Sequence, residues 1–378
     1  MGRGLTVGTG VAAGVALLIA GVTSAGLLGL RGGEPAPQVT FSSVSPTPGA
    51  RPRPAGPAPA LDADRVLARV EVDPAALPVR GVDSAAVVVV VQDDAVGIHH
   101  IALDATTGEW VRLDPATITG SVLDVSPDGR WAALRAYDAT AGVSDQVVEL
   151  ATGTVRAATS VVPPDQDPSD CYTWPAAWAP GGGRSAAVTQ CRHLPSDPRQ
   201  AAYQETWLHE IDLATGATRL LEYLPGVSTS APGASYSPDG KLLAYVVEVP
   251  DAAGQTLMVL RIVALDGSAT RPLVAVHPVH GDPWLDAHTL VAWSATEDVD
   301  VLVDAATGTT TPLGVADTME HRGTVGGRLV LGARGGPMAC GAAACVVDPV
   351  AATSQPWLTL PGNGQVLVVM PARAVVQP

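Results

Sequence analysis

The sequence predicts an all-β protein, a β-propeller of four-stranded antiparallel blades that follows an N-terminal transmembrane helix and a proline-rich stalk. Three observations lead to this prediction. The first 30 residues are nearly free of charge, and the next 30 are rich in proline. The remainder repeats two turn motifs between short β-type runs, on average about 50 residues apart, which is close to the length of one propeller blade.

Composition limits the classes of function. The chain has 378 residues, 22 Lys and Arg against 37 Asp and Glu, and a formal net charge of −15. A protein with this charge repels the phosphate backbone, so we expect no nucleic-acid partner. Because 47% of the residues are hydrophobic, the chain has enough apolar side chains to build a folded core.

Residues 1–30 carry a membrane-spanning signal. No side chain from Leu5 to Leu30 is charged, and Arg3 and Arg31 flank the segment. As a helix this segment would be about 39 Å long, which exceeds the ~30 Å hydrocarbon core of a bilayer. A cleaved signal peptide is the alternative, with Thr23-Ser24-Ala25 as its cleavage site. We expect an uncleaved anchor with a short cytoplasmic tail, because the apolar run continues to Leu30.

Residues 31–60 cannot build a packed core. They contain eight prolines among Ser, Gly and Ala. Chains of this composition favour extended polyproline II, at about 3.1 Å per residue. We expect a disordered linker that acts as a stalk, with the folded domain over residues 61–378.

The cysteines indicate the compartment. Cys171, Cys191, Cys340 and Cys345 form two local pairs, and neither pair has the CxxC spacing of a zinc or redox site. An even number of cysteines after an export signal favours disulfides in an oxidising, extracytoplasmic compartment. We therefore expect a single-pass protein of the cell membrane whose C-terminal domain lies outside the cytoplasm.

Two turn motifs recur through residues 61–378. One begins with an acidic residue and ends in Gly, at 104–108, 149–153, 212–216 and 304–308. The other is Ser-Pro-Asp-Gly at 126–129 and 237–240, with a looser copy at 179–182. Both suit tight hairpins, because Gly accepts a positive φ at no steric cost and Pro fixes the first turn position. One repeat therefore reads as four short antiparallel strands.

The segments 126–134 and 237–245, Ser-Pro-Asp-Gly followed by a core strand, resemble the blades of bacterial TolB-like, WD40-like propellers. In that family the motif is a hairpin turn, so the resemblance implies a fold and no catalytic residue. The chain length predicts six blades, or seven if the irregular repeats run near 42 residues. Since the first blade begins with its second strand at 85–91, a C-terminal strand at 364–370 is expected to complete it.

Blade topology places both motif turns on one face and the long, irregular loops on the other, where function is expected. The candidate binding residues of this variable-loop face are Tyr172, Trp174, His277, His280, Asp282, Trp284 and His321. The two imidazoles and the carboxylate of 277–282 are suitable metal ligands, but the segment supplies no fourth ligand, so we expect no metal and no cofactor.

Searches for catalytic motifs find none. A G-x-S-x-G elbow and a P-loop are absent, and His209-Glu210 is followed by Leu213 where HExxH requires a second His. We expect a protein-interaction or ligand-binding module at the cell envelope, with an envelope protein or glycan as partner. The alternative is a propeller hydrolase or lyase acting on an envelope glycan or peptide, because a propeller can assemble acid and base groups from several blades.

Overall fold

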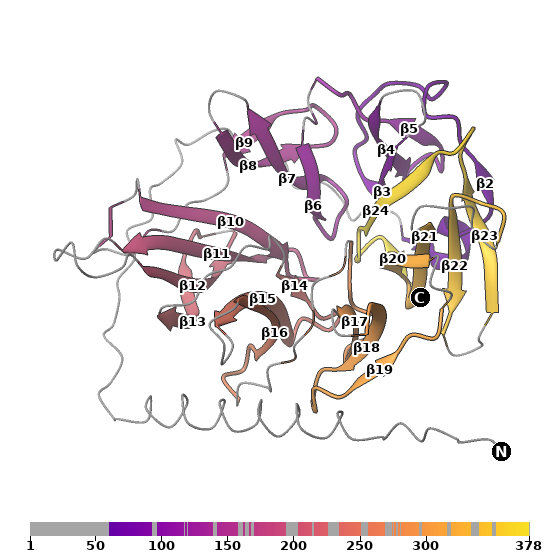
Figure 1. The fold of residues 1–378 in the computed structure, drawn as a ribbon. Helices are drawn as coiled ribbons and strands as arrows, with labels where there is room; N and C mark the ends of the chain where they lie inside the picture. Colours follow the sequence, from indigo (N-terminus) through magenta and orange to yellow (C-terminus); the bar gives the residue numbers. More distant parts are fainter. Residues whose placement is uncertain are drawn as a thin grey trace, which may run out of the picture.

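The computed structural model describes residues 60–377 except for 93–96, 117, 119, 139–141, 158–161, 163–165, 168–169, 194–202, 214, 226–233, 251–255, 269–273, 275, 277–278, 280, 295–296, 316–318, 334–339 and 350–352. The predicted transmembrane segment and nearly all of the predicted stalk lie outside these residues. Within the described part of the chain, no helix has the length and apolar character needed to cross a bilayer. The fold is all-β, as predicted, and six sheets of three to five strands lie in a ring (Figure 1).

The first three sheets of the ring each have four strands. The first is β24 (Gln365–Pro371), β3 (Ala85–Gln92), β4 (Ile98–Asp104) and β5 (Trp110–Arg112). The second is β6 (Gly120–Val125), β7 (Trp131–Asp138), β8 (Gly142–Glu149) and β9 (Val155–Ala157). The third is β10 (Cys171–Trp178), β11 (Arg184–His193), β12 (Tyr203–Asp212) and β13 (Thr218–Pro225).

The next three sheets differ in their number of strands. The fourth is β14 (Ser235–Tyr236), β15 (Leu242–Pro250) and β16 (Thr256–Ala264). The fifth is β17 (Thr289–Ser294), β18 (Val299–Asp304) and β19 (Thr310–Pro312). The sixth is β20 (Met319–Val325), β21 (Arg328–Ala333), β22 (Ala344–Asp348), β23 (Thr353–Thr359) and β2 (Val70–Glu71).

The Ser-Pro-Asp-Gly motif forms the turn between the first two strands of its sheet, as predicted. In the second sheet, the Ser126 hydroxyl donates to the Asp128 carboxylate at 2.7 Å and accepts the Trp131 N–H at 2.9 Å. Gly129 closes the turn with a φ of 71°. The fourth sheet repeats this geometry around Ser237. The motif is therefore a structural turn, and its serine and aspartate are occupied in holding the hairpin.

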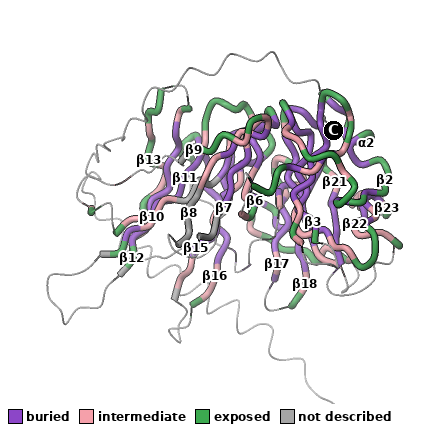
Figure 2. Tube along the Cα trace, turned by 90° about the horizontal axis from the view of Figure 1, so that it is seen from above, coloured by how far each residue is buried: buried purple, intermediate pink, exposed green. Residues whose placement is uncertain are grey.

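The C-terminal strand closes the ring. β24 pairs antiparallel with β3, so the last long strand of the chain is the innermost strand of the first sheet, which confirms the expected completion at 364–370. The partner strand is a run of valines, and every residue from Val87 to Val91 is buried. Figure 2 shows that buried positions follow the strands while exposed positions gather at their ends.

The residues that follow the proline-rich segment also connect the last sheet of the ring to the first. β1 (Leu61–Asp62) pairs with the terminal strand β25 (Val376–Gln377), and β2 pairs with β23 of the sixth sheet. Farther along, Val79 bridges to Arg112 of the first sheet. Between β1 and β2 lies the short helix α2 (Ala63–Val66), whose last carbonyl accepts the indole N–H of Trp357 at 3.0 Å. The segment 61–80, which we call the N-terminal strap, thus joins the last and first sheets from outside.

The expected local disulfides form. Cys171–Cys191 joins β10 to β11 at directly opposite positions, and Cys340–Cys345 closes the segment that leads into β22. Neither bond joins two sheets, so the disulfides stabilise individual sheets and do not close the ring.

A pair of glycines tests the contact between the first two sheets. Gly129 and Gly216 have the same φ of 71°, but a Cβ on Gly129 would lie 2.0 Å from the Ala85 carbonyl oxygen, whereas one on Gly216 would meet nothing within 4 Å. We expect Gly216→Ala to lower the free energy of unfolding by about 1 kcal/mol and Gly129→Ala by about 3 kcal/mol or more, because the second forces two backbones apart. Urea unfolding of both variants measures the difference; equal losses would contradict the close approach.

Candidate functional site

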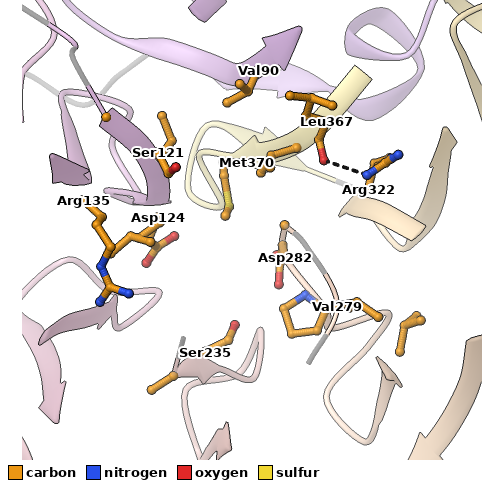
Figure 3. A pocket seen from close by; sticks show the side chains of 18 of the residues that line it. Val90, Ser121, Asp124, Arg135, Ser235, Val279, Asp282, Arg322, Leu367 and Met370 are labelled. Atoms are coloured by element: carbon orange, nitrogen blue, oxygen red, sulfur yellow. Dashed lines mark hydrogen bonds between the residues drawn. The ribbon is translucent and has the colours of Figure 1, made fainter. Parts of the chain in front are cut away.

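A cavity of about 890 Å³ lies where the inner strands of five sheets converge (Figure 3). The first, second, fourth, fifth and sixth sheets contribute to its wall. Most of the wall is aliphatic, from Val, Ile, Leu and Met side chains of β3, β6, β15, β17 and β24. The polar members are few: His100, Ser121, Asp124, Arg135, Ser235, Asp282, Arg322 and Arg373.

Arg373 forms one end of the cavity. It lies two residues after the end of the closing strand β24, in a turn where Ala374 N–H donates to the Pro127 carbonyl at 2.9 Å. This contact places Arg373 at the face that carries the Ser-Pro-Asp-Gly turns. Its guanidinium donates from Nε to Asp282 Oδ2 at 2.9 Å and from Nη2 to Ser235 Oγ at 2.9 Å.

The Arg373–Asp282 pair is strong and central. A second guanidinium nitrogen contacts the other oxygen of Asp282, and Nη1 donates to the Tyr236 carbonyl, so the pair is bidentate and all three guanidinium nitrogens donate a hydrogen bond. Burial opposes the charge of Arg373, but the carboxylates of Asp282 and Asp124 raise its pKa above the ordinary value. One side chain therefore connects the closing strand to the fourth sheet and to the segment before the fifth.

Asp124 lines the cavity from the inner strand of the second sheet. Its carboxylate accepts the N–H of Val125 at 2.8 Å and the N–H of Trp178, in the third sheet, at 2.9 Å. Burial raises the pKa of Asp124 to about 7; the charge of Arg373 and the two backbone hydrogen bonds lower it, and Asp282 raises it. Asp124 is thus a carboxyl group that changes protonation near neutral pH.

Two further polar side chains of the wall, His100 and Arg322, are buried in the structure. His100 is buried, and its Nε2 has no hydrogen-bond partner among the residues that the structure describes. Burial lowers its pKa to about 4, so the imidazole is neutral at pH 7. Arg322 pairs with Glu320 and donates to the carbonyls of Ala333 at 3.1 Å and Leu367 at 3.4 Å, the latter drawn in Figure 3.

Asp282 is the predicted binding residue that the structure places in the cavity wall. The sequence grouped it with His277 and His280, which lie outside the described residues. Its partner in the structure is instead Arg373, 91 positions later in the chain. Among the residues that the structure describes, no group of three or more His, Cys, Asp and Glu could hold a metal ion.

Trp284 and His321 were expected to be surface contact residues, and this expectation is wrong. Trp284 is 1% exposed and its indole N–H donates to the Ser235 carbonyl at 3.0 Å, so the ring packs between the fourth and fifth sheets. His321 is 2% exposed within β20, and its Nε2 lies 3.1 Å from the hydroxyl of Thr324. Both are core residues: His321 belongs to the strand β20, and Trp284 forms a single bridge to Leu290 of β17, so segments that sequence reasoning assigned to loops pack against the sheets.

Tyr172 and Trp174 also lie in a strand. Both belong to β10, where Tyr172 is opposite Gln190 and Trp174 is opposite Val188. Tyr172 is half-buried and packs against the core between the third and fourth sheets. Their assignment to a loop is corrected, and a role in binding stays a prediction.

Sequence reasoning missed Asp124 and Arg373. A signal existed for Asp124, since it is the one charged residue in the apolar run Gly120–Val125 directly before a Ser-Pro-Asp-Gly turn. Arg373 likewise follows the apolar closing strand. Neither position identifies its partners, because those come from other sheets.

Comparison with known proteins gives similarities of structure alone. No protein-family model and no curated protein matches the chain. Among solved structures, TolB from Acinetobacter baumannii has a TM-score of 0.39 at 13% identity, over 76% of this chain and 67% of TolB. An oligogalacturonate lyase in complex with manganese has a TM-score of 0.42 at 15% identity, over 68% of this chain and 70% of the lyase.

A Pyrococcus horikoshii acylaminoacyl peptidase has a TM-score of 0.41 at 12% identity, over 74% of this chain but only 46% of the peptidase. This chain therefore spans less than half the length of that enzyme. The similar structures include TolB, whose family the Ser-Pro-Asp-Gly segments resemble.

The Arg373–Asp282 pair yields a prediction about stability. Replacing Arg373 with Met leaves a buried carboxylate without its counter-charge, which typically costs about 3–5 kcal/mol. The matched control is Arg69→Met, because the Arg69–Glu71 pair is exposed and should contribute less than about 1 kcal/mol. Urea unfolding at pH 7 measures both variants. Adding Asp282→Leu to Arg373→Met should recover part of the loss; an Arg373→Met protein as stable as the control would contradict a central role for the pair.

Proposed function

We propose that this protein is a six-bladed propeller that binds a small molecule in its central cavity and is held at the outer side of a membrane by its N-terminal helix. The observation that carries the binding role is the cavity itself. Its volume of about 890 Å³ and its aliphatic wall with a few converging polar groups are typical of small-molecule sites.

The six-blade assignment is supported by the order of the sheets. The described residues form six sheets of three or more strands, and the strand that closes the first comes from the C-terminus. In the fourth sheet, Leu260 of β16 forms a bridge to Val274 on the outer side of the described strands. We assign one blade to each of these sheets.

The location is inferred from the sequence and from the strap. The charge-free segment of residues 5–30 is long enough to span a bilayer, and disulfides such as Cys171–Cys191 persist in oxidising compartments. The strap begins at Leu61, directly after the proline-rich segment, so the stalk would join the propeller at its closure. An envelope protein or glycan bound by the loop face would be a further partner.

A second candidate is a hydrolase or lyase that acts on an envelope glycan or peptide. Asp124 favours it, because a cavity carboxyl with a pKa of about 7 suits a general acid or base. This reading requires turnover, whereas the binding role requires only saturable occupancy.

The binding proposal is tested by saturation-transfer NMR on the full chain in lipid nanodiscs. The probes are four small sets of aliphatic amines, alcohols, carboxylates and monosaccharides. We expect at least one set to give saturable transfer that Ser121→Trp abolishes, since Ser121 is exposed and lines the cavity. Ser268→Trp, at an exposed turn away from the cavity, is the matched control and should keep the signal.

Three other results would count against parts of the proposal. No binding by any set, or binding that Ser121→Trp leaves intact, would contradict the cavity as the site. New resonances from a consumed glycan or peptide probe would favour the enzyme. A reporter fused after Pro378 that is active only outside the cytoplasm tests the location, and an inactive reporter would contradict it.

A further inference from the structure

Asp124 differs from Asp282, the other acidic residue of the described cavity lining, in its hydrogen bonds. Both of its contacts are backbone N–H groups, from Val125 at 2.8 Å and Trp178 at 2.9 Å. Among the described residues, no side chain donates a hydrogen bond to its carboxylate. Each carboxylate oxygen has a second lone pair, so Asp124 retains acceptor capacity, and Figure 3 shows the group facing the cavity.

Two of the three neighbouring arginines, Arg373 and Arg322, are paired with other acidic groups. Arg373 uses its donors on Asp282 and on the two residues of β14, and it acts on Asp124 only through its charge. Arg322 is paired with Glu320. Arg135 lies on the same side of the cavity as Asp124 and is the group that would instead favour an anionic ligand (Figure 3). The ligand that best complements Asp124 therefore brings its own positive charge.

The remaining wall suits a hydrocarbon body. Val122, Val246, Leu260, Leu290 and Met370 line the cavity, and its described lining contains no Trp, Tyr or Phe. Sugar-binding sites commonly use such rings as flat platforms, so the lining described here offers a sugar few stacking contacts. Burial of aliphatic surface contributes about 25 cal/mol per Å².

We propose that the cavity binds a small aliphatic amine, whose ammonium group pairs with Asp124 and whose hydrocarbon body packs against these aliphatic side chains. This inference rests on the proposed binding function and specifies its ligand. An ammonium group supplies up to three donors, and a charge-assisted hydrogen bond to a carboxylate is stronger where water is excluded.

The protonation state of Asp124 gives the proposal a measurable consequence, a proton released on amine binding. Burial raises the pKa of Asp124 to about 7, so at pH 6 the free carboxyl is mostly protonated. The charged groups that act on it are Arg373 and Asp282, which remain paired with each other, and Arg135 lies on its side of the cavity. A bound ammonium ion favours the ionised carboxylate and displaces the proton, so amine binding at pH 6 releases a proton.

The test compares three probes of the same size by isothermal titration calorimetry: cyclohexylmethylamine, cyclohexylmethanol and cyclohexanecarboxylate. Titrations of the full chain in nanodiscs at pH 6, in two buffers of different ionisation enthalpy, give both affinity and proton release. We expect the amine to bind about tenfold tighter than the alcohol or better, and to release the proton while the alcohol releases none.

Two variants test the contribution of the Asp124 carboxylate separately from that of the rest of the cavity. Asp124→Asn should weaken amine binding by about tenfold or more and abolish the proton release, while alcohol binding stays the same. Asp286→Asn is the matched control, because the Asp286 carboxylate also accepts two backbone N–H groups but lies outside the cavity wall. It should leave the amine affinity and the proton release unchanged.

The outcomes distinguish this inference from the function beneath it. If cyclohexanecarboxylate binds most tightly of the three probes, or if the amine binds without proton release, the amine proposal is overturned. Ligand binding in the cavity would still stand. Should Asp124→Asn fail to fold, the proton release of the unmodified protein still decides the question. If no probe binds here and no set gives saturation transfer, both the inference and the proposed function fail.

Discussion

The pairing of β24 with β3 is the constraint on which the rest of the structure depends. β3 carries five successive valines, all buried, and without β24 one edge of this apolar strand would be unpaired. The same pairing positions Arg373, which lies two residues after β24 and donates a hydrogen bond to Asp282. Closure therefore creates both the first sheet and one end of the cavity, so fold and candidate site share one cause.

The N-terminal strap reinforces this closure from outside. β1 lies against the terminal strand β25, β2 extends the sixth sheet, and Val79 bridges to the first sheet. The indole of Trp357 bonds to the carbonyl of Val66, and its ring lies 6.3 Å from that of Trp110. The first and last described segments thus meet at one place, where hydrogen bonds and buried aromatic surface hold the last sheet to the first.

The sequence contains the local part of this architecture and little of the part formed by distant residues. The Ser-Pro-Asp-Gly turns and the closing strand were predictable because each follows from a few adjacent residues, such as Ser126 and Gly129. The strap was not, because two-residue strands carry no periodicity. Trp284 and His321 were misassigned to surface loops since burial depends on neighbouring sheets, and the Arg373–Asp282 pair joins residues 91 positions apart. Such contacts have no signal in a single sequence.

Native-state hydrogen exchange on the full chain tests the central claim most directly. If β24 closes the ring, the amides of β24 residues that pair with Val88–Val91 should exchange as slowly as the amides of those valines, only through global unfolding. Amides of β24 that exchange through local opening, well before those of β3 or β7, would contradict closure by the C-terminal strand. That result would also remove the basis for a cavity bounded by Arg373.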